Sequence, residues 1–313
     1  MANIVVTEFI DAGVLDVLHA DYSVHHDPSL WTKPEELRAL SADAVGMIVR
    51  NRTQVDEALL AVAPKLKVVG RLGVGLDNID MPACKARGVV VCPAVGANAV
   101  SVAEYVIASA LILPRGPMFF GSHRLAAGEW PREEMTKGRE NFGRRFGIIG
   151  FGSIGQIVGE KAKALGMEIV AYDGFIPADS VVWQKAQRLT LDELLETSDI
   201  ITLHCPLTPE TRGLIGAREL ARMKKGAVLI NTSRGGVVDE PALADALRSG
   251  HLAGAAVDVF TAEPIDRATG AIFRDVPNVI LTPHVAGVTL EANMRVSTMT
   301  VENVRRELKA LQS

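Results

Sequence analysis

The sequence has few cysteines and few aromatic residues, and it has no excess of basic residues. Its three cysteines, Cys84, Cys92 and Cys205, stand in apolar surroundings without the spacing of metal ligands. This pattern predicts buried, reduced thiols and no metal site. The formal net charge of −4 gives no electrostatic reason to expect nucleic acid or an anionic membrane as a partner. Any anion-binding site must therefore be a local concentration of arginine.

Long apolar runs and targeting signals are also lacking. The most apolar stretch, residues 102–113, contains Glu104 and is too short for a bilayer, which takes about 20 residues. The N-terminus has no basic region and meets Glu8 too early for a secretory signal peptide. We therefore expect a cytoplasmic protein.

Short β-branched runs alternate with helical patterns in the first third of the chain. Strands are expected at residues 3–7, 44–49, 67–70 and 89–91, and helices at 12–20 and 55–62. Continuous apolar strands separated by helices are typical of parallel strands covered on both faces. The pattern predicts an α/β doubly wound domain with a flavodoxin-like sheet.

A second series of alternating elements follows. Strands are expected at residues 146–149, 168–172, 199–203, 227–230, 254–257 and 278–281, with helices at 154–165 and 240–248. Six strands with crossovers make a complete Rossmann sheet, which binds dinucleotides. A helix over 98–113 bridges the two series, and an amphipathic helix over 290–311 returns to the first domain.

The chain is long enough for two domains, since one core rarely grows beyond about 250–300 residues. We predict two doubly wound parallel-sheet domains with a cleft between them. The substrate-binding domain comprises residues 1–97 and 288–313, and the dinucleotide-binding domain comprises residues 98–287.

A glycine-rich turn lies between the strand at 146–149 and the helix at 154–165. Gly150, Gly152 and Gly155 have G-x-G-x-x-G spacing, a weak signal alone that is strengthened here by the strand before it and the helix after it. Such glycines let backbone N–H groups approach a pyrophosphate at a helix N-terminus. Asp173 can accept hydrogen bonds from both ribose hydroxyls, and its charge repels a 2′-phosphate. The predicted cofactor is therefore NAD rather than NADP.

Three polar residues, Arg234, Glu263 and His284, stand just after three successive strands of the second series. Each alone is equally explained as an ion-pair partner, a solvated acid or a turn histidine. Ligands of open α/β sheets bind outside the carboxyl ends of the strands. We therefore expect the three residues to share one crevice with the glycine-rich turn.

This set of residues suits hydride transfer to a 2-keto acid. Histidine can deliver a proton to the carbonyl oxygen near neutral pH, and a neighbouring carboxylate orients the ring and stabilises its charge. A guanidinium binds the substrate carboxylate with two parallel hydrogen bonds, which lysine cannot do. The prediction is His284 as the acid–base group, Glu263 as its partner and Arg234 as the carboxylate-binding cation.

Several runs of sequence carry a wider resemblance: VGRLGVGLDN at 69–78, VAE at 102–104, LINTSRGGVVD at 229–239, AVDVF at 256–260, EP at 263–264 and TPH at 282–284. Together they resemble the D-isomer-specific 2-hydroxyacid dehydrogenases over essentially the whole chain, nearest the catalytic core of the 3-phosphoglycerate dehydrogenase branch. The resemblance implies catalysis by Arg234, Glu263 and His284. The implied NAD-binding residues are Gly150, Gly152, Ser153, Ile154, Gly155, Asp173, Cys205, Pro206, Thr232, Asp258, His284 and Gly287.

The same resemblance implies that the backbone near Asn51, Gly73, Val74 and Gly75 binds the substrate carboxylate. Asn51 and Val74 stand where small hydroxyl residues are common, and Ser153 stands where an arginine is common, so both contacts are expected to differ in detail. No regulatory domain is expected after Ser313. The resemblance further implies a homodimer that pairs through residues 98–140.

Two arginines, Arg50 and Arg71, lie near the carboxyl ends of the first-domain strands, beside the loop at 73–75. They predict a second anionic subsite for a phosphate or sulfonate on C3. Arg52 lies further along its loop and is equally explained as a solvated basic edge. The candidates are 3-phosphoglycerate and (S)-sulfolactate, which has the D-hydroxy acid arrangement because sulfur outranks the carboxyl group in priority. Hydroxypyruvate, glyoxylate and other 2-keto acids remain alternatives.

An NAD-sensing binding protein of the corepressor type is an alternative of another class, since fold alone does not settle function. The set of Arg234, Glu263 and His284 persists in such proteins and does not exclude them. Arg50 and Arg71 favour the enzyme, and Glu263 disfavours a formate-type dehydrogenase.

Overall fold

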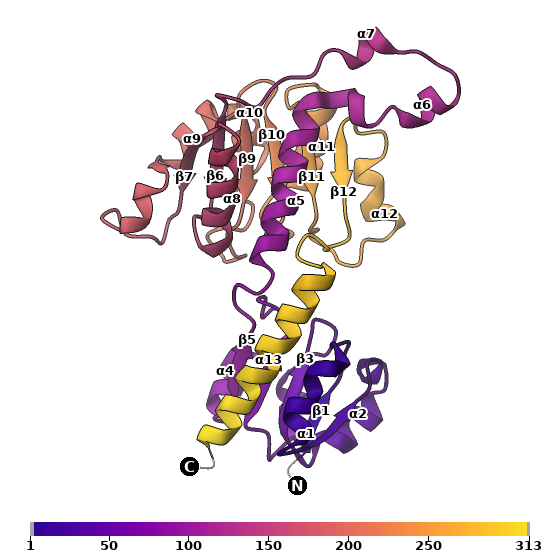
Figure 1. Cartoon of the computed structure of the whole chain (residues 1–313), viewed down its shortest axis with the longest axis vertical. Coiled ribbons are helices and arrows are strands. Elements are labelled where there is room, and N and C mark those ends of the chain that lie inside the picture. The colour runs from indigo at the N-terminus through magenta and orange to yellow at the C-terminus, as the bar shows by residue number, and fades with distance from the viewer. Residues whose placement is uncertain (1–2, 312–313) are drawn as a thin grey trace. The chain divides into compact units, whose positions relative to one another are not determined.

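A computed structural model describes residues 3–311 of the chain, and its internal contacts divide it into two compact units. Unit 1 comprises Met1–Asn98 and Val288–Ser313, and unit 2 comprises Ala99–Gly287. Each unit is built around one sheet, in which every pair of neighbouring strands is parallel (Figure 1). The predicted α/β fold class is confirmed.

The sheet of unit 1 has the order β2-β1-β3-β4-β5, the flavodoxin-like arrangement. Its strands are β1 (Asn3–Val6), β2 (Ser23–His26), β3 (Ala44–Val49), β4 (Val68–Arg71) and β5 (Val90–Pro93). Its helices are η1 (Ala12–Leu15), α1 (Asp16–His19), η2 (Leu30–Thr32), α2 (Pro34–Ser41), α3 (Glu57–Ala61), α4 (Met81–Ala86) and α13 (Leu290–Ala310). The edge strand β2 was not predicted, because its sequence, SVHH, has no continuous apolar run.

The last helix, α13, packs on β3, β4 and β5 of unit 1. Its first turn is capped by Thr289, whose hydroxyl accepts a hydrogen bond from the Ala292 N–H at 3.0 Å. Val296, Val304 and Leu308 recur at helical spacing and are buried in the core around β1 and β3. The helix thereby covers one face of the sheet.

The sheet of unit 2 has the order β12-β11-β10-β9-β6-β7-β8, which is the Rossmann order with one further strand. Its strands are β6 (Arg145–Ile149), β7 (Glu168–Tyr172), β8 (Gln187–Arg188), β9 (Ile200–Leu203), β10 (Val228–Asn231), β11 (Gly254–Val257) and β12 (Val279–Leu281). Its helices are α5 (Ala99–Ile112), η3 (Leu113–Phe119), α6 (Ser122–Ala126), α7 (Arg132–Met135), α8 (Ser153–Ala164), η4 (Val181–Gln184), α9 (Leu191–Thr197), α10 (Ala217–Arg222), α11 (Glu240–Arg248), α12 (Arg267–Gly270) and η5 (Ala271–Phe273). The prediction of six strands missed β8, whose two residues are polar and exposed.

The segment Ala99–Ala126 is long and apolar enough, by length and composition alone, to cross a membrane. Within it, α5 packs along α8, and Val102, Val106 and Ala110 are buried in the core of unit 2. Gly116, with φ of 59°, interrupts the helical conformation inside η3. Burial against the sheet therefore accounts for the apolar character of α5.

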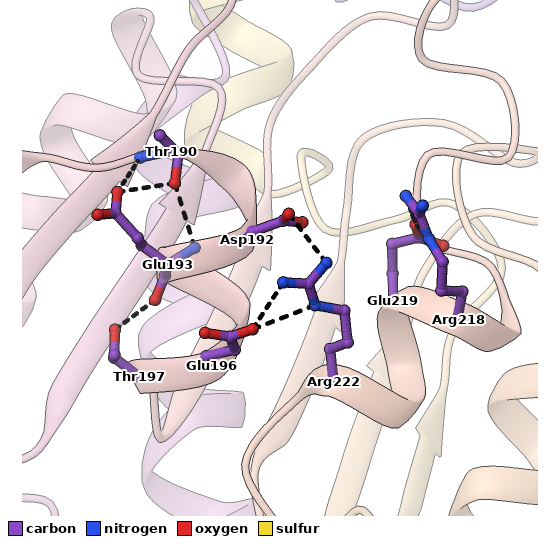
Figure 2. A network of polar contacts seen from close by, with 8 residues as sticks. All are labelled: Thr190, Asp192, Glu193, Glu196, Thr197, Arg218, Glu219 and Arg222. Atoms are coloured by element: carbon purple, nitrogen blue, oxygen red, sulfur yellow. Dashed lines mark hydrogen bonds and ion pairs between the residues drawn. The ribbon is translucent and has the colours of Figure 1, made fainter.

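Polar side chains join α9 to α10 on the surface of unit 2 (Figure 2). Thr190 and Glu193 form a capping box, in which the Thr190 N–H donates to the Glu193 carboxylate at 2.9 Å. Arg222 of α10 donates to Glu196 at 2.6 Å and pairs with Asp192 at 2.9 Å. Water screens ion pairs at an exposed surface, so these contacts orient the two helices more than they stabilise the fold.

Candidate active site

Glu263 and His284 form a close pair beyond the carboxyl ends of β11 and β12. The distance from His284 Nδ1 to Glu263 Oε2 is 2.7 Å, and Glu263 Oε1 accepts the Phe260 N–H at 2.8 Å. Burial alone would raise the pKa of the Glu263 carboxyl, but the hydrogen bonds from His284 and Phe260 and the charges of His284 and Arg234 hold that pKa below its usual value. Because Nδ1 faces this carboxylate, Nε2 is the ring nitrogen that remains for a substrate, and 48% of the side chain is exposed.

The turn that carries His284 is held from behind by Asp258, which is 1% exposed. Asp258 Oδ1 accepts the Thr282 hydroxyl at 2.5 Å and the Val285 N–H at 2.9 Å, and Oδ2 accepts the Ala286 N–H at 2.9 Å. The His284 N–H donates to the Asp258 carbonyl at 2.7 Å. His284 has φ of 57°, a left-handed conformation that persists only where surrounding contacts enforce it.

Arg234 follows β10 and is brought to the same edge of the sheet. A Cβ atom on Gly235 would overlap the carbonyl of Phe260, so the segment after Arg234 lies directly against the segment that leads to Glu263. The guanidinium donates to the Ser233 carbonyl at 2.7 Å, and its charge acts on Glu263. Unit 2 thus gathers Arg234, Glu263 and His284 within one cluster at the carboxyl ends of its strands.

The glycine-rich turn connects β6 to the N-terminus of α8. Gly150 has φ of 92°, and a Cβ atom there would overlap the backbone of His204. The space beside Gly152 is open, with no atom within 4 Å of a Cβ built there. Gly152 is exposed at the start of α8, where backbone N–H groups point outward, so the turn fits the pyrophosphate of NAD.

Asp173, at the end of β7, is tied to this turn. Its Oδ2 accepts the Phe151 N–H at 2.9 Å, and its Oδ1 accepts the N–H groups of Phe175 at 2.8 Å and Ile176 at 3.1 Å. A carboxylate has about four lone-pair positions, so one remains on Oδ2 for a ribose hydroxyl. Asp173 was expected to accept hydrogen bonds from both ribose hydroxyls, but its carboxylate has one acceptor position left.

The other predicted cofactor residues of unit 2 follow its strands. Cys205 and Pro206 come after β9, Thr232 after β10, and Gly287 ends the unit. The Thr232 hydroxyl is buried and has no hydrogen-bond partner within residues 3–311, as suits a group that awaits a ligand. Burial raises the pKa of the Cys205 thiol to about 11, so it is a neutral thiol and not a nucleophile.

His204 was missed by the sequence analysis, although it directly follows a predicted strand. Its Nε2 lies 3.1 Å from the Thr202 hydroxyl, and its buried Nδ1 has no partner in the described part of the chain. Burial lowers the pKa of His204 to about 3, so the ring is neutral at physiological pH. Among residues 3–311, no group of three or more His, Cys, Asp or Glu side chains could hold a metal ion.

In unit 1, Arg50 is held by neutral partners. Its Nη2 donates to Asn293 Oδ1 of α13 at 2.8 Å, and its guanidinium lies 5.9 Å from the centroid of the Phe9 ring. Burial lowers the pKa of Arg50 although the charge of Glu8 acts in the opposite direction. The positive charge is therefore incompletely compensated, and an anionic ligand would stabilise it. Asn293 and Phe9 were not predicted.

Glu8 is a buried carboxylate, 3% exposed, at the end of β1. It accepts four consecutive backbone N–H groups, those of Arg50 and Thr53 on Oε1 and those of Asn51 and Arg52 on Oε2, at 2.8–3.2 Å. The Asn51 N–H, expected to bind substrate, is therefore engaged by Glu8. The exposed Asn51 side chain remains available. The signal for Glu8 in the sequence was an acid directly after an apolar strand.

Arg71 is the last residue of β4, and its side chain folds back over the loop that follows. Its Nη1 donates to the Leu72 carbonyl at 2.8 Å and occupies the space that a Cβ atom on Gly73 would need. Val74 is exposed and Gly75 is half-buried at the same loop. Arg52 instead lies over the Trp31 ring, 4.8 Å from its centroid. Arg50, Arg52 and Arg71 thus contact different partners.

A Rossmann sheet with a glycine-rich turn and a Glu–His–Arg cluster at the carboxyl ends of its strands is typical of dinucleotide-dependent dehydrogenases. Residues 113–286 match the family model described as D-isomer specific 2-hydroxyacid dehydrogenase, NAD binding domain. The (S)-sulfolactate dehydrogenase of Chromohalobacter salexigens is 47% identical over 98% of this chain and 99% of that protein. The D-3-phosphoglycerate dehydrogenase of Mycobacterium leprae is 41% identical over 88% of this chain, which matches only 52% of that longer protein.

Among solved structures, the D-lactate dehydrogenase of Aquifex aeolicus, complexed with NAD and lactic acid, superposes with a TM-score of 0.85 at 30% identity. The match covers 98% of this chain and 96% of that one. The chain belongs to the D-isomer-specific 2-hydroxyacid dehydrogenase family and is an NAD-dependent oxidoreductase of 2-hydroxy acids. The predicted family, reaction class and cofactor are confirmed.

Proposed function

We propose that the chain interconverts (S)-sulfolactate and the corresponding 2-keto acid with NAD as the cofactor. This substrate is favoured by Arg50, whose charge is desolvated and whose guanidinium contacts, within residues 3–311, are the neutral Asn293 side chain and the Phe9 ring. A sulfonate on C3 would supply the missing negative charge. The full-length similarity to a relative named (S)-sulfolactate dehydrogenase supports the same choice.

A second candidate is 3-phosphoglycerate, which also places a strong anion on C3. It is favoured by the relatives named D-3-phosphoglycerate dehydrogenase, of which this chain spans about half the length. Both candidates require a cation that binds the anionic group on C3, in addition to the cation that binds the C1 carboxylate. Arg71, which lies on the next strand, is proposed to assist Arg50 in binding this group.

The cluster of unit 2 is proposed to perform the chemistry. NAD, held by the turn from Gly150 to Gly155, would supply the hydride acceptor for C2 of the hydroxy acid. His284 Nε2 accepts the proton of the C2 hydroxyl, while Glu263 holds Nδ1 and stabilises the charge that develops on the ring. Arg234 is proposed to bind the C1 carboxylate through its planar guanidinium. Within unit 1, the proposed substrate-binding groups are the Asn51 side chain and the loop of Gly73, Val74 and Gly75.

The cofactor is proposed to lie along the carboxyl ends of the strands of unit 2. The turn from Gly150 to Gly155, with Ser153 and Ile154, binds the pyrophosphate, and Asp173 accepts one ribose hydroxyl. The remaining proposed contacts are Cys205, Pro206, Thr232, Asp258, His284 and Gly287. The buried and unsatisfied Thr232 hydroxyl is the observation in the structure that favours this path.

The chain is further proposed to act in the cytoplasm as a homodimer that pairs through residues 98–140. Phe119, Phe120 and Trp130 are 50%, 42% and 79% exposed, and pairing through this segment would bury them. Light scattering at micromolar concentration tests the dimer, and a monomer mass would contradict it.

The substrate proposal is tested by turnover of NAD with (S)-sulfolactate, 3-phosphoglycerate and D-glycerate, and of NADH with hydroxypyruvate and glyoxylate. The expected result is the highest kcat/KM for (S)-sulfolactate. Higher efficiency with glyoxylate or hydroxypyruvate would refute the second anion subsite. Binding of NAD without turnover of any acid would favour an NAD-sensing binding protein instead.

A further inference from the structure

Tyr105, on α5, joins a hydrogen-bonded chain that ends at the turn carrying His284. Its hydroxyl lies 2.7 Å from the Thr282 hydroxyl, which in turn lies 2.5 Å from Asp258 Oδ1. Tyr105 and Thr282 are 177 residues apart in the sequence. The functions proposed above use neither of these two side chains.

The direction of each hydrogen bond follows from counting protons. The Asp258 carboxylate can only accept, so the single hydroxyl proton of Thr282 goes to Asp258. The Thr282 oxygen must then receive its second hydrogen bond from Tyr105. Burial raises the pKa of the Tyr105 hydroxyl, which keeps it protonated and able to donate. The chain therefore runs from Tyr105 through Thr282 to Asp258, and each bond polarises the next.

The far end of this chain is the support of His284. Asp258 accepts the backbone N–H groups of Val285 and Ala286 and offers its carbonyl to the His284 N–H. These bonds enforce the left-handed conformation at His284. Glu263 holds the imidazole ring, whereas Asp258 holds the backbone from which the ring projects.

We propose that Tyr105 is a positioning residue for His284, acting through Thr282 and Asp258. The neutral hydrogen bond of its hydroxyl is worth a modest free energy, but the bond is made to a buried group one step from a carboxylate. Its loss lets the turn at residues 284–286 shift, which changes the placement of Nε2 rather than the affinity of the protein for a hydroxy acid. This inference rests on the acid–base role proposed for His284.

The test is Tyr105→Phe, which removes one hydroxyl and leaves the packing of the ring. We expect kcat to fall about 2- to 12-fold, the range for one neutral hydrogen bond, with KM for (S)-sulfolactate changed by less than about twofold. The primary isotope effect with deuterated hydroxy acid should rise, because hydride transfer becomes more rate-limiting. Tyr22→Phe is the matched control, because the Tyr22 hydroxyl is buried and has no partner in the described part of unit 1.

A double-mutant cycle separates positioning from a general effect on the fold. Thr282→Val should lower kcat at least as much as Tyr105→Phe, and Tyr105→Phe should have no further effect in the Thr282→Val background. Thr282→Ser, which keeps the hydroxyl, should retain most of kcat. His284→Ala is measured alongside. The role of Tyr105 would be overturned if His284→Ala lost most of its kcat while folded Tyr105→Phe kept the wild-type kcat. Fully additive effects of Tyr105→Phe and Thr282→Val would overturn it as well, and in both cases the role of His284 would stand. Unchanged kcat in His284→Ala would refute the acid–base assignment itself.

Discussion

Replacing Arg50 by glutamine should separate substrates by the charge on their tail. A charge-assisted hydrogen bond contributes about 1.5–3 kcal/mol, which corresponds to roughly 10- to 150-fold in kcat/KM. This loss applies only to an acid that brings a second anion. For D-lactate or D-glycerate the change removes a contact to the Asn293 amide and a stacking contact to Phe9, both in unit 1. The effect on those acids should therefore stay within about threefold, the lower end of a neutral hydrogen bond.

The assay is NAD reduction by each acid at constant pH and ionic strength, with kcat and KM determined separately. The loss for (S)-sulfolactate should lie in KM and should change little with salt, because a partly buried charge pair is screened much less than an exposed one. Arg52→Gln is the matched control, since Arg52 is an exposed arginine that lies over Trp31. Equal losses for charged and uncharged tails in Arg50→Gln would show that Arg50 is structural, and the preference for a second anion would have to be withdrawn.

Three further predictions concern the cofactor, the pH dependence and the stability of the loop at residues 50–53. NAD should exceed NADP in kcat/KM by at least about tenfold, the ratio that corresponds to 1.4 kcal/mol, because Asp173 carries its charge at the ribose edge; equal efficiencies would refute this. Glu263→Gln removes the carboxylate that holds His284 Nδ1, so kcat of keto acid reduction should fall, and an unchanged kcat would remove Glu263 from its assigned role. Because the pKa of Glu263 lies below its usual value, its side chain stays ionised in the wild type as the pH falls through about 4.5. The stability that the Glu263–His284 pair contributes is lost only at lower pH. Glu8→Gln should lower the free energy of unfolding by about 3 kcal/mol in a urea titration, since an amide cannot accept four N–H groups.

The elements that were predicted most closely are those in which one apolar pattern decides the structure. β3, β7, β11 and α11 begin and end at the predicted residues, because their continuous apolar runs or helical spacing are buried along their whole length or on one face. The edge strands β2 and β8 were missed because exposure on their outer side removes that signal. Such strands are defined by hydrogen bonds to a neighbouring strand, which no local pattern records.

In the site, too, residues next to a predicted strand could be predicted, whereas contacts between distant parts of the chain could not. The residue types and order of Arg234, Glu263 and His284 follow strands that were visible in the sequence, so their chemistry could be predicted. Asn293 and Tyr105 could not be predicted, because the groups they contact lie 243 and 177 residues away in the chain. The way Arg71 folds over its own loop is a choice of rotamer, which depends on packing rather than on sequence spacing.

We propose that this chain oxidises a D-configured 2-hydroxy acid that carries a second strong anion. The most direct measurement is the initial rate of NAD reduction with the two separate enantiomers of sulfolactate. We expect turnover of (S)-sulfolactate, which has the D arrangement at C2, at a kcat/KM well above that of D-lactate. The (R) enantiomer should show little or no turnover. A preference for (R)-sulfolactate, or a higher kcat/KM with D-lactate than with either enantiomer, would contradict it.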